Sequence, residues 1–189
     1  MQRAAFVLAG GRSSRMGRDK ALLPMEGHSL IEHVAEQARS VTNDIALVGE
    51  RTRYANFGYR VIEDIFPGHG PLAGLHAALA SSHSEWNLVL ACDMPQIRRE
   101  FLLQLIERAE AGAAAAVVPV GPDRIPQPLC AAYHRTCAAA IAHALERGIR
   151  KVTDGLAALD IDFWPVPHSH YFRNLNTPED WAAYSHADR

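Results

Sequence analysis

The stretch AAFVLAGGRSSRMGRDK, Ala4 to Lys20, joins a short apolar run to a glycine-rich and strongly basic segment. The run from Ala4 to Ala9 is continuous rather than alternating, and Gly10 and Gly11 stop it. This pattern is typical of a strand that is buried on both faces of a parallel sheet. The stretch therefore predicts a buried first strand of an α/β fold, followed by a long loop.

The rest of the chain alternates between short apolar runs and segments of helical periodicity. Ser29 to Glu32 forms a capping-box pattern at the start of the first predicted helix. Further strands are expected at 44–48, 59–62, 87–92, 114–120 and 129–133, and further helices at 72–79, 101–111, 136–147 and after Thr177. Such alternation favours a single three-layer domain over residues 1–189, Rossmann-like, with a mostly parallel sheet covered by helices on both faces.

Composition narrows the functional classes. The chain has 189 residues, 48% hydrophobic and 21% charged, with a net charge of −2. No global basic field would draw it to nucleic acid or to an anionic membrane, and no apolar run approaches the roughly 20 residues of a membrane span. We expect a cytoplasmic protein whose anion recognition is local, with Cys92, Cys130 and Cys137 as buried free thiols.

The glycine-rich loop does not match either of two common phosphate-binding patterns. Its glycines do not have the G-x-G-x-x-G spacing of dinucleotide-binding folds, and Gly17 is not followed by the Lys-Ser/Thr of a Walker A loop. What remains is a loop of freed backbone amides with cations, which suits phosphate groups: Arg12, Arg15, Arg18 and Lys20. The alternative is a flexible basic surface loop, and in both interpretations we expect the loop to be exposed.

In parallel sheets, ligands bind at the carboxyl ends of the strands. The glycine-rich loop after the first strand and Asp93 after the strand at 87–92 would both lie there. A carboxylate at that position suits Mg²⁺, although Asp93 could instead cap the following helix.

Other polar residues each have a structural and a functional interpretation. Asp64 could bind a nucleotide or simply form a turn, and the turn that ends at Gly74 could bind an anion or only open a helix. Asn174 and Asn176 could contact a polar ligand such as a pterin or belong to a helix cap, and Arg150 could bind a phosphate or be an exposed surface cation.

Six blocks of sequence carry a family resemblance over nearly the whole chain. They are LAGG with RMG and DKALL (8–23), VIED (61–64), GPLAG (70–74), CDMP (92–95), QPL (127–129) and NLNTP (174–178). In this order they resemble the molybdenum cofactor nucleotidyltransferases, which belong to the glycosyltransferase-A-like nucleotidyltransferases. The NLNTP ending and the short chain resemble the guanylyl branch, as does Gly10, where similar cytidylyl enzymes have alanine.

The resemblance implies roles for individual residues. Leu8, Ala9 and Gly10 would bind the nucleotide together with Asp64, Lys20 would bind its phosphates, and Asp93 would be the magnesium ligand. The chemistry of the residues themselves adds further candidates: Gly11 and Gly74 for the nucleotide, Arg15 for charge stabilisation, and Asn174, Asn176 and Arg150 for the second substrate. One position departs from the family pattern, because Val48 stands where the family has an asparagine.

The implied reaction transfers GMP from GTP to the phosphate of molybdopterin with release of pyrophosphate, and uses Mg²⁺. Molybdoenzyme apoproteins or their chaperones would then be partners that receive the product. Two rival functions are open at this point: a cytidylyl or sugar-phosphate nucleotidyltransferase of the same fold, and a non-catalytic nucleotide-binding module that delivers cofactor to molybdoenzymes. Retention of Arg15, Lys20 and Asp93 together speaks against the second, because delivery needs no charge-stabilising groups.

Overall fold

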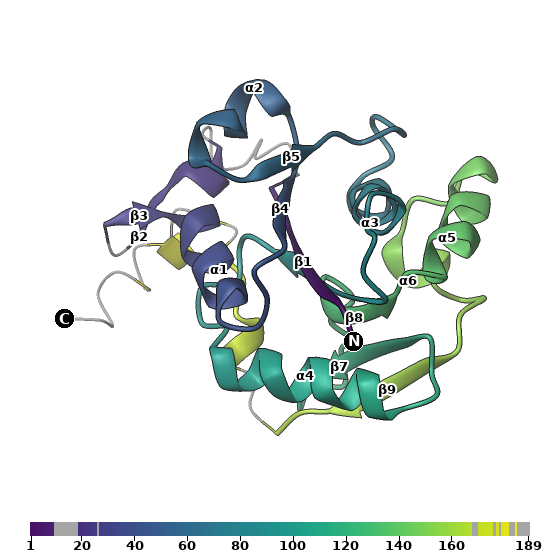
Figure 1. Ribbon diagram of the computed structural model, residues 1–189. Helices are drawn as coiled ribbons and strands as arrows, with labels where there is room; N and C mark the ends of the chain where they lie inside the picture. The colour runs from purple at the N-terminus through teal and green to yellow at the C-terminus, as the bar shows by residue number, and fades with distance from the viewer. Residues whose placement is uncertain are drawn as a thin grey trace.

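The first strand, β1 (Arg3–Leu8), forms where the sequence predicts it and lies between two parallel neighbours. A computed structural model describes residues 1–9, 19–25, 27–167, 170–175, 177, 179–181 and 184 (Figure 1). Ala5, Phe6 and Val7 are fully buried. The apolar run therefore occupies the interior of the sheet, as its lack of alternation indicates.

The described residues form a seven-stranded sheet in the order β5-β4-β1-β6-β8-β7-β9. The other strands are β4 (Ile45–Val48), β5 (Arg60–Ile62), β6 (Trp86–Ala91), β7 (Ala116–Val120), β8 (Cys130–His134) and β9 (Ile161–Pro165). All neighbours run parallel except β8, which is antiparallel to both β6 and β7. The mostly parallel sheet is confirmed. Sequence reasoning missed β9, a half-exposed edge strand without a buried apolar run.

Helices cover both faces of the sheet, and local signals set their ends. The helices are α1 (Leu30–Arg39), α2 (Arg51–Tyr54), α3 (Pro71–Ala80), α4 (Arg99–Ala111), α5 (Cys137–Glu146) and α6 (Val152–Gly155). The capping box at α1 is confirmed, because Ser29 N donates to Glu32 Oε2 at 2.8 Å and Glu32 N to Ser29 Oγ at 3.4 Å. Gly70, with φ of 71°, precedes Pro71 at the first turn of α3. Thr177 also caps, since its Oγ1 accepts from Asp180 N at 3.1 Å.

Each strand of the sheet centre contributes to two separate cores. Ala5 and Val7 of β1 pack into the cluster beneath α1 and α4, whereas Phe6 and Leu8 pack into the cluster beneath α3 and α5. Figure 1 shows α1 and α4 on one side of the sheet and α3, α5 and α6 on the other. The three-layer arrangement is thus confirmed, and it leaves the strand ends as the place where the layers open.

Cys92, Cys130 and Cys137 are buried and carry no disulfide, as expected. No described helix is long and apolar enough to cross a membrane.

A small third cluster, built by Met25, Leu30, Leu175 and Tyr184, packs the C-terminal segment against the short hairpin of β2 (Pro24–Met25) and β3 (His28–Ser29).

His76 gives the fold a testable pH dependence. It lies in α3 with 6% exposure, stacks edge-on against Phe66 at 5.3 Å between ring centroids, and its Nδ1 has no hydrogen-bond partner among the described residues. Burial lowers the pKa of this imidazole below its ordinary value of 6.5. Below that pH the unfolded chain takes up a proton that the folded protein resists, so the free energy of unfolding falls.

We therefore expect His76→Leu to flatten the loss of stability between pH 7.5 and 5.5. Urea unfolding at both values should show the wild type losing more than the variant, by at most about 1.4 kcal/mol per pH unit for one proton. His83→Leu, at an exposed histidine, serves as the control and should follow the wild type. An identical pH dependence in His76→Leu would contradict the assignment.

Candidate active site

The carboxyl ends of four parallel strands meet at one edge, which we call the site edge. Leu8 of β1 is in register with Val48 of β4 and with Ala91 of β6, and Val48 is in register with Ile62 of β5. The backbone continues this pairing, because Cys92 N donates to Leu8 O at 3.1 Å. The residues that follow these strands are therefore neighbours in space, as expected for one site assembled from distant segments.

Asp93 is the buried carboxylate of the site edge. It is 8% exposed, and its Oδ2 accepts an ion-paired hydrogen bond from Lys20 Nζ at 2.5 Å. Its Oδ1 is buried without a hydrogen-bond partner among the described residues. The alternative that Asp93 caps a helix is wrong, because α4 begins at Arg99 and Arg98 is its capping position.

Lys20 reaches Asp93 from a short 3₁₀ helix, η1 (Lys20–Leu22), which begins directly after Asp19. The Asp19 carboxylate caps this helix, since its Oδ1 accepts from Ala21 N at 3.1 Å. The Lys20 side chain is 17% exposed, so the expectation of an exposed position is wrong for this residue. The ion pair draws the ammonium group inward, because a buried carboxylate needs a compensating charge.

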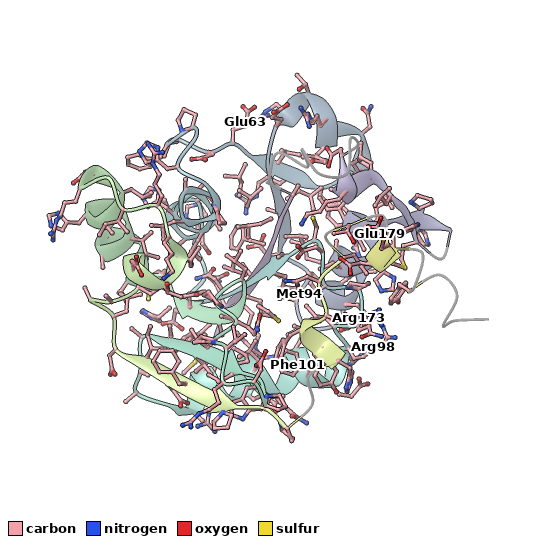
Figure 2. All side chains as sticks on the ribbon, turned by 180° about the vertical axis from the view of Figure 1, so that it is seen from behind. Glu63, Met94, Arg98, Phe101, Arg173 and Glu179 are labelled. Atoms are coloured by element: carbon pink, nitrogen blue, oxygen red, sulfur yellow. The ribbon has the colours of Figure 1, made fainter. Side chains whose placement is uncertain are left out.

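The C-terminal segment lies beside Asp93. Leu175 N donates to Asp93 O at 2.9 Å, and Asn174 Oδ1 is a second buried oxygen without a partner among the described residues. Figure 2 shows Met94, which follows Asp93, close to Arg173, which precedes Asn174. The hydrogen bond from Leu175 thus places the segment that carries Asn174 beside Asp93, although the two are far apart in the sequence.

Gly74 and Asp64 have visible structural roles near the site edge. A Cβ at Gly74 would lie 3.0 Å from Leu8 Cδ2 and 3.8 Å from Val48 Cγ1, so glycine lets α3 pack closely on β1 and β4. Val48, which stands where the family pattern has an asparagine, is therefore an apolar residue packed against α3. Asp64 Oδ1 accepts from Phe66 N at 2.7 Å, which confirms the turn, while nucleotide binding by Asp64 and Gly74 stays a prediction.

The positions of the remaining candidate residues do not test their predicted roles. Ala9 N donates to Val48 O at 2.9 Å, so the backbone of Leu8 and Ala9 already takes part in sheet pairing, and a nucleotide contact there stays a prediction. Arg150 is exposed between α5 and α6. Four of the predicted site residues lie outside the described part of the chain, namely Gly10, Gly11, Arg15 and Asn176.

Two residues that the sequence did not indicate, Tyr54 and His33, hydrogen-bond to the segments that carry Lys20 and Asp93. The Tyr54 hydroxyl lies 2.8 Å from Asp19 Oδ2 and 3.3 Å from Ala9 O. His33 Nε2 lies 3.0 Å from Pro95 O and so supports the turn that carries Asp93. The role of His33 could have been suspected from the sequence, because it is a polar residue on the apolar face of α1. The role of Tyr54 could not, because its partners are distant in the sequence.

The chemistry available at the site edge is electrostatic. Among the described ranges, no three His, Cys, Asp or Glu side chains gather into a metal cluster. Burial, and to a lesser degree the neighbouring Asp93 charge, raises the pKa of the Cys92 thiol to about 12, so Cys92 stays protonated and is no nucleophile. The Lys20 ammonium can bind and orient anions, and the Asp93 oxygen that lacks a partner among the described residues can hold a cation beside them.

Comparison with known proteins agrees with this geometry. The family model described as MobA-like NTP transferase domain matches residues 5–160. A probable molybdenum cofactor guanylyltransferase of Pelotomaculum thermopropionicum is 35% identical over 95% of this chain and 90% of its own length. The molybdenum cofactor guanylyltransferase of Yersinia pestis is 35% identical over 92% of this chain and 90% of its own length.

A solved structure shows the same arrangement of elements. It is the molybdopterin-guanine dinucleotide biosynthesis protein A of Archaeoglobus fulgidus, with a TM-score of 0.85 and 29% identity over 98% of both chains. The family match covers Lys20, Asp93 and the carboxyl ends of the four strands that form the site edge. The chain therefore belongs to the MobA-like NTP transferase family, and it is a nucleotidyltransferase.

Proposed function

We propose that this nucleotidyltransferase transfers GMP from GTP to the phosphate of molybdopterin and releases pyrophosphate. The observation that carries the proposal is the pair of Lys20 and Asp93 at the site edge, at 2.5 Å, with Asp93 Oδ1 uncommitted among the described residues. The relatives named guanylyltransferases support the choice of GTP and molybdopterin as substrates.

The reaction needs no protein nucleophile. An oxygen of the acceptor phosphate attacks the α-phosphorus of GTP, a new P–O bond forms, and the bond from the α-phosphorus to the bridging oxygen breaks. Pyrophosphate leaves with that electron pair, and no proton has to move. The barrier comes from the approach of anions, so Lys20, Arg15 and the backbone amides of Gly10 and Gly11 would act by holding phosphates and stabilising charge.

The donor set at Asp93 fits Mg²⁺. Its Oδ1 is a buried oxygen without a partner among the described residues, and hard cations prefer oxygen ligands. Because Mg²⁺ usually takes one or two carboxylates and completes its shell with water and substrate phosphate, a single aspartate suffices. When bound, the ion would reduce the negative charge of the phosphates at the reacting centre.

The second substrate would lie on the C-terminal side of Asp93. Asn174 Oδ1 is a buried oxygen without a partner among the described residues, on the segment that is hydrogen-bonded to Asp93 O, so it could accept a hydrogen bond from an N–H group of the pterin. Asn176 and Arg150 belong to the same proposal as contacts of the acceptor, and Leu8, Ala9, Asp64 and Gly74 as contacts of the nucleotide. The proposal also includes a cytoplasmic location and delivery of the product to molybdoenzyme apoproteins or their chaperones.

The proposed base preference can be measured directly. We expect kcat/KM with GTP to exceed that with CTP by at least about tenfold, or about 1.4 kcal/mol. The reason is that glycine at position 10 leaves room for a purine, and polar groups that bind guanine would be left unpaired by a pyrimidine. Pyrophosphate release with molybdopterin, Mg²⁺ and each triphosphate gives the ratio.

The same assay separates the rival functions. Equal use of both triphosphates, or a preference for CTP, would favour the cytidylyl reaction. Pyrophosphate release with a sugar phosphate in place of molybdopterin would favour a sugar nucleotidyltransferase. Nucleotide binding without any turnover would favour a delivery module, and it would contradict the proposed reaction.

A further inference from the structure

Tyr54 lies beneath the site edge with its hydroxyl enclosed. It is the last residue of α2, is 2% exposed, and lies with its ring 6.3 Å from that of Phe57, between centroids. A Cβ at Gly49 would lie 2.7 Å from Tyr54 Cε2, so only glycine allows the ring this position. Gly49 thus allows close packing around the Tyr54 ring, whose hydroxyl points toward the site edge.

Among the described residues, the hydroxyl has two partners, Ala9 and Asp19, which stand on either side of the stretch 10–18. Ala9 directly follows β1, and its carbonyl oxygen lies 3.3 Å from the hydroxyl. Asp19 Oδ2 lies 2.8 Å from the same hydroxyl, while Asp19 Oδ1 caps η1. One oxygen atom therefore links the end of the first strand to the start of the helix that carries Lys20.

The direction of this hydrogen bond follows from the environment. Burial, followed by the contact with the Asp19 carboxylate, raises the pKa of the Tyr54 hydroxyl well above its ordinary value, so the proton stays on tyrosine. The single proton is donated to the nearer acceptor, Asp19 Oδ2, and the bond is charge-assisted. Arg53 Nη1 approaches the same oxygen at 3.4 Å from a half-exposed side chain.

We propose that Tyr54 is a positioning residue of the transfer reaction. Its hydroxyl fixes Asp19, Asp19 fixes the first turn of η1, and this turn sets the place from which Lys20 reaches the reacting phosphates. The inference rests on the proposed function for its catalytic consequence. The contact itself is independent of that function.

Tyr54→Phe removes the hydroxyl and keeps the ring. We expect kcat/KM for GTP to fall about tenfold or more, the usual effect of losing a hydrogen bond to a charged group. Because Asp19 is then less fixed, hydrogen exchange of the Ala21 amide should become faster. Tyr59→Phe is the matched control, since its hydroxyl also contacts a carboxylate, Glu36 at 2.9 Å, but on the outer side of α1.

A double-mutant cycle tests whether Tyr54 acts through Asp19. Asp19→Asn keeps an oxygen that can cap η1 but weakens the acceptor for Tyr54. If the two residues act through one contact, the double variant should be no slower than the slower single variant, whereas independent roles would multiply the losses. Multiplied losses would overturn the proposal.

Two readouts separate this inference from the proposed function. If Tyr54→Phe matches the wild type in both turnover and Ala21 exchange, or only lowers the melting temperature, the positioning role is refuted. If the wild type releases no pyrophosphate from GTP, the proposed function fails. In that case unchanged Ala21 exchange in Tyr54→Phe would still refute the contact, and faster exchange would support it.

Discussion

Lys20→Ala should slow pyrophosphate release from GTP by roughly 30- to 1,000-fold, which corresponds to about 2–4 kcal/mol of lost transition-state stabilisation. Lys20 is the described cation that bonds to Asp93, at 2.5 Å, and alanine leaves the phosphates without this charge. Steady-state kcat/KM for GTP at saturating Mg²⁺ measures the effect.

The variant will also lose stability, which the assay has to separate from catalysis. Alanine leaves the buried Asp93 carboxylate without its ion pair, at a cost of about 3–5 kcal/mol. Urea unfolding fixes the folded fraction at the assay temperature. Arg39→Ala removes an exposed cation that pairs with Glu36 on α1 and serves as the control. Turnover by folded Lys20→Ala within threefold of the wild type would contradict the catalytic role.

Asp93→Asn should reduce Mg²⁺-dependent turnover by about 100-fold or more, the range expected when a charged group at the reacting centre is lost. Asparagine keeps the size of the side chain and an oxygen for Lys20, and the backbone bond from Leu175 to Asp93 O is unaffected. The melting temperature should therefore move by only a few degrees. Mn²⁺ binding in the presence of GTP gives a second readout, and it should weaken in parallel.

Asp44→Asn provides the matched control for this substitution. Asp44 directly precedes β4 at the amino end of the sheet, opposite to the site edge, and its carboxylate pairs with Arg60 at 3.6 Å. Full activity is expected there. If Asp93→Asn instead unfolds at the assay temperature, or retains Mn²⁺ affinity, Asp93 is a structural residue and the metal assignment is wrong.

Much of the fold could be predicted because its signals are local. The continuous run 4–9, the capping box at Ser29 and the Gly70-Pro71 start of α3 act within a few residues of where they stand. The carboxyl ends of parallel strands share an edge of the sheet, so the sequence could place Asp93 at the same edge as the segment that follows the first strand. Lys20 meets Asp93 at that edge. The elements missed are short or half-exposed, such as α2, α6 and β9, whose composition gives no periodic signal.

The chain by itself thus determined most of the longer elements, the mostly parallel sheet and the placement of Lys20 and Asp93 at one edge of it, because periodicity and charge can be read directly from the sequence. Only the tertiary structure decided that Lys20 turns inward, that Asp93 does not cap α4, and that Leu175 is bonded to Asp93 O. It alone brought Tyr54 to Ala9 and Asp19. Burial and hydrogen bonding between distant segments depend on packing in three dimensions, which no local pattern encodes.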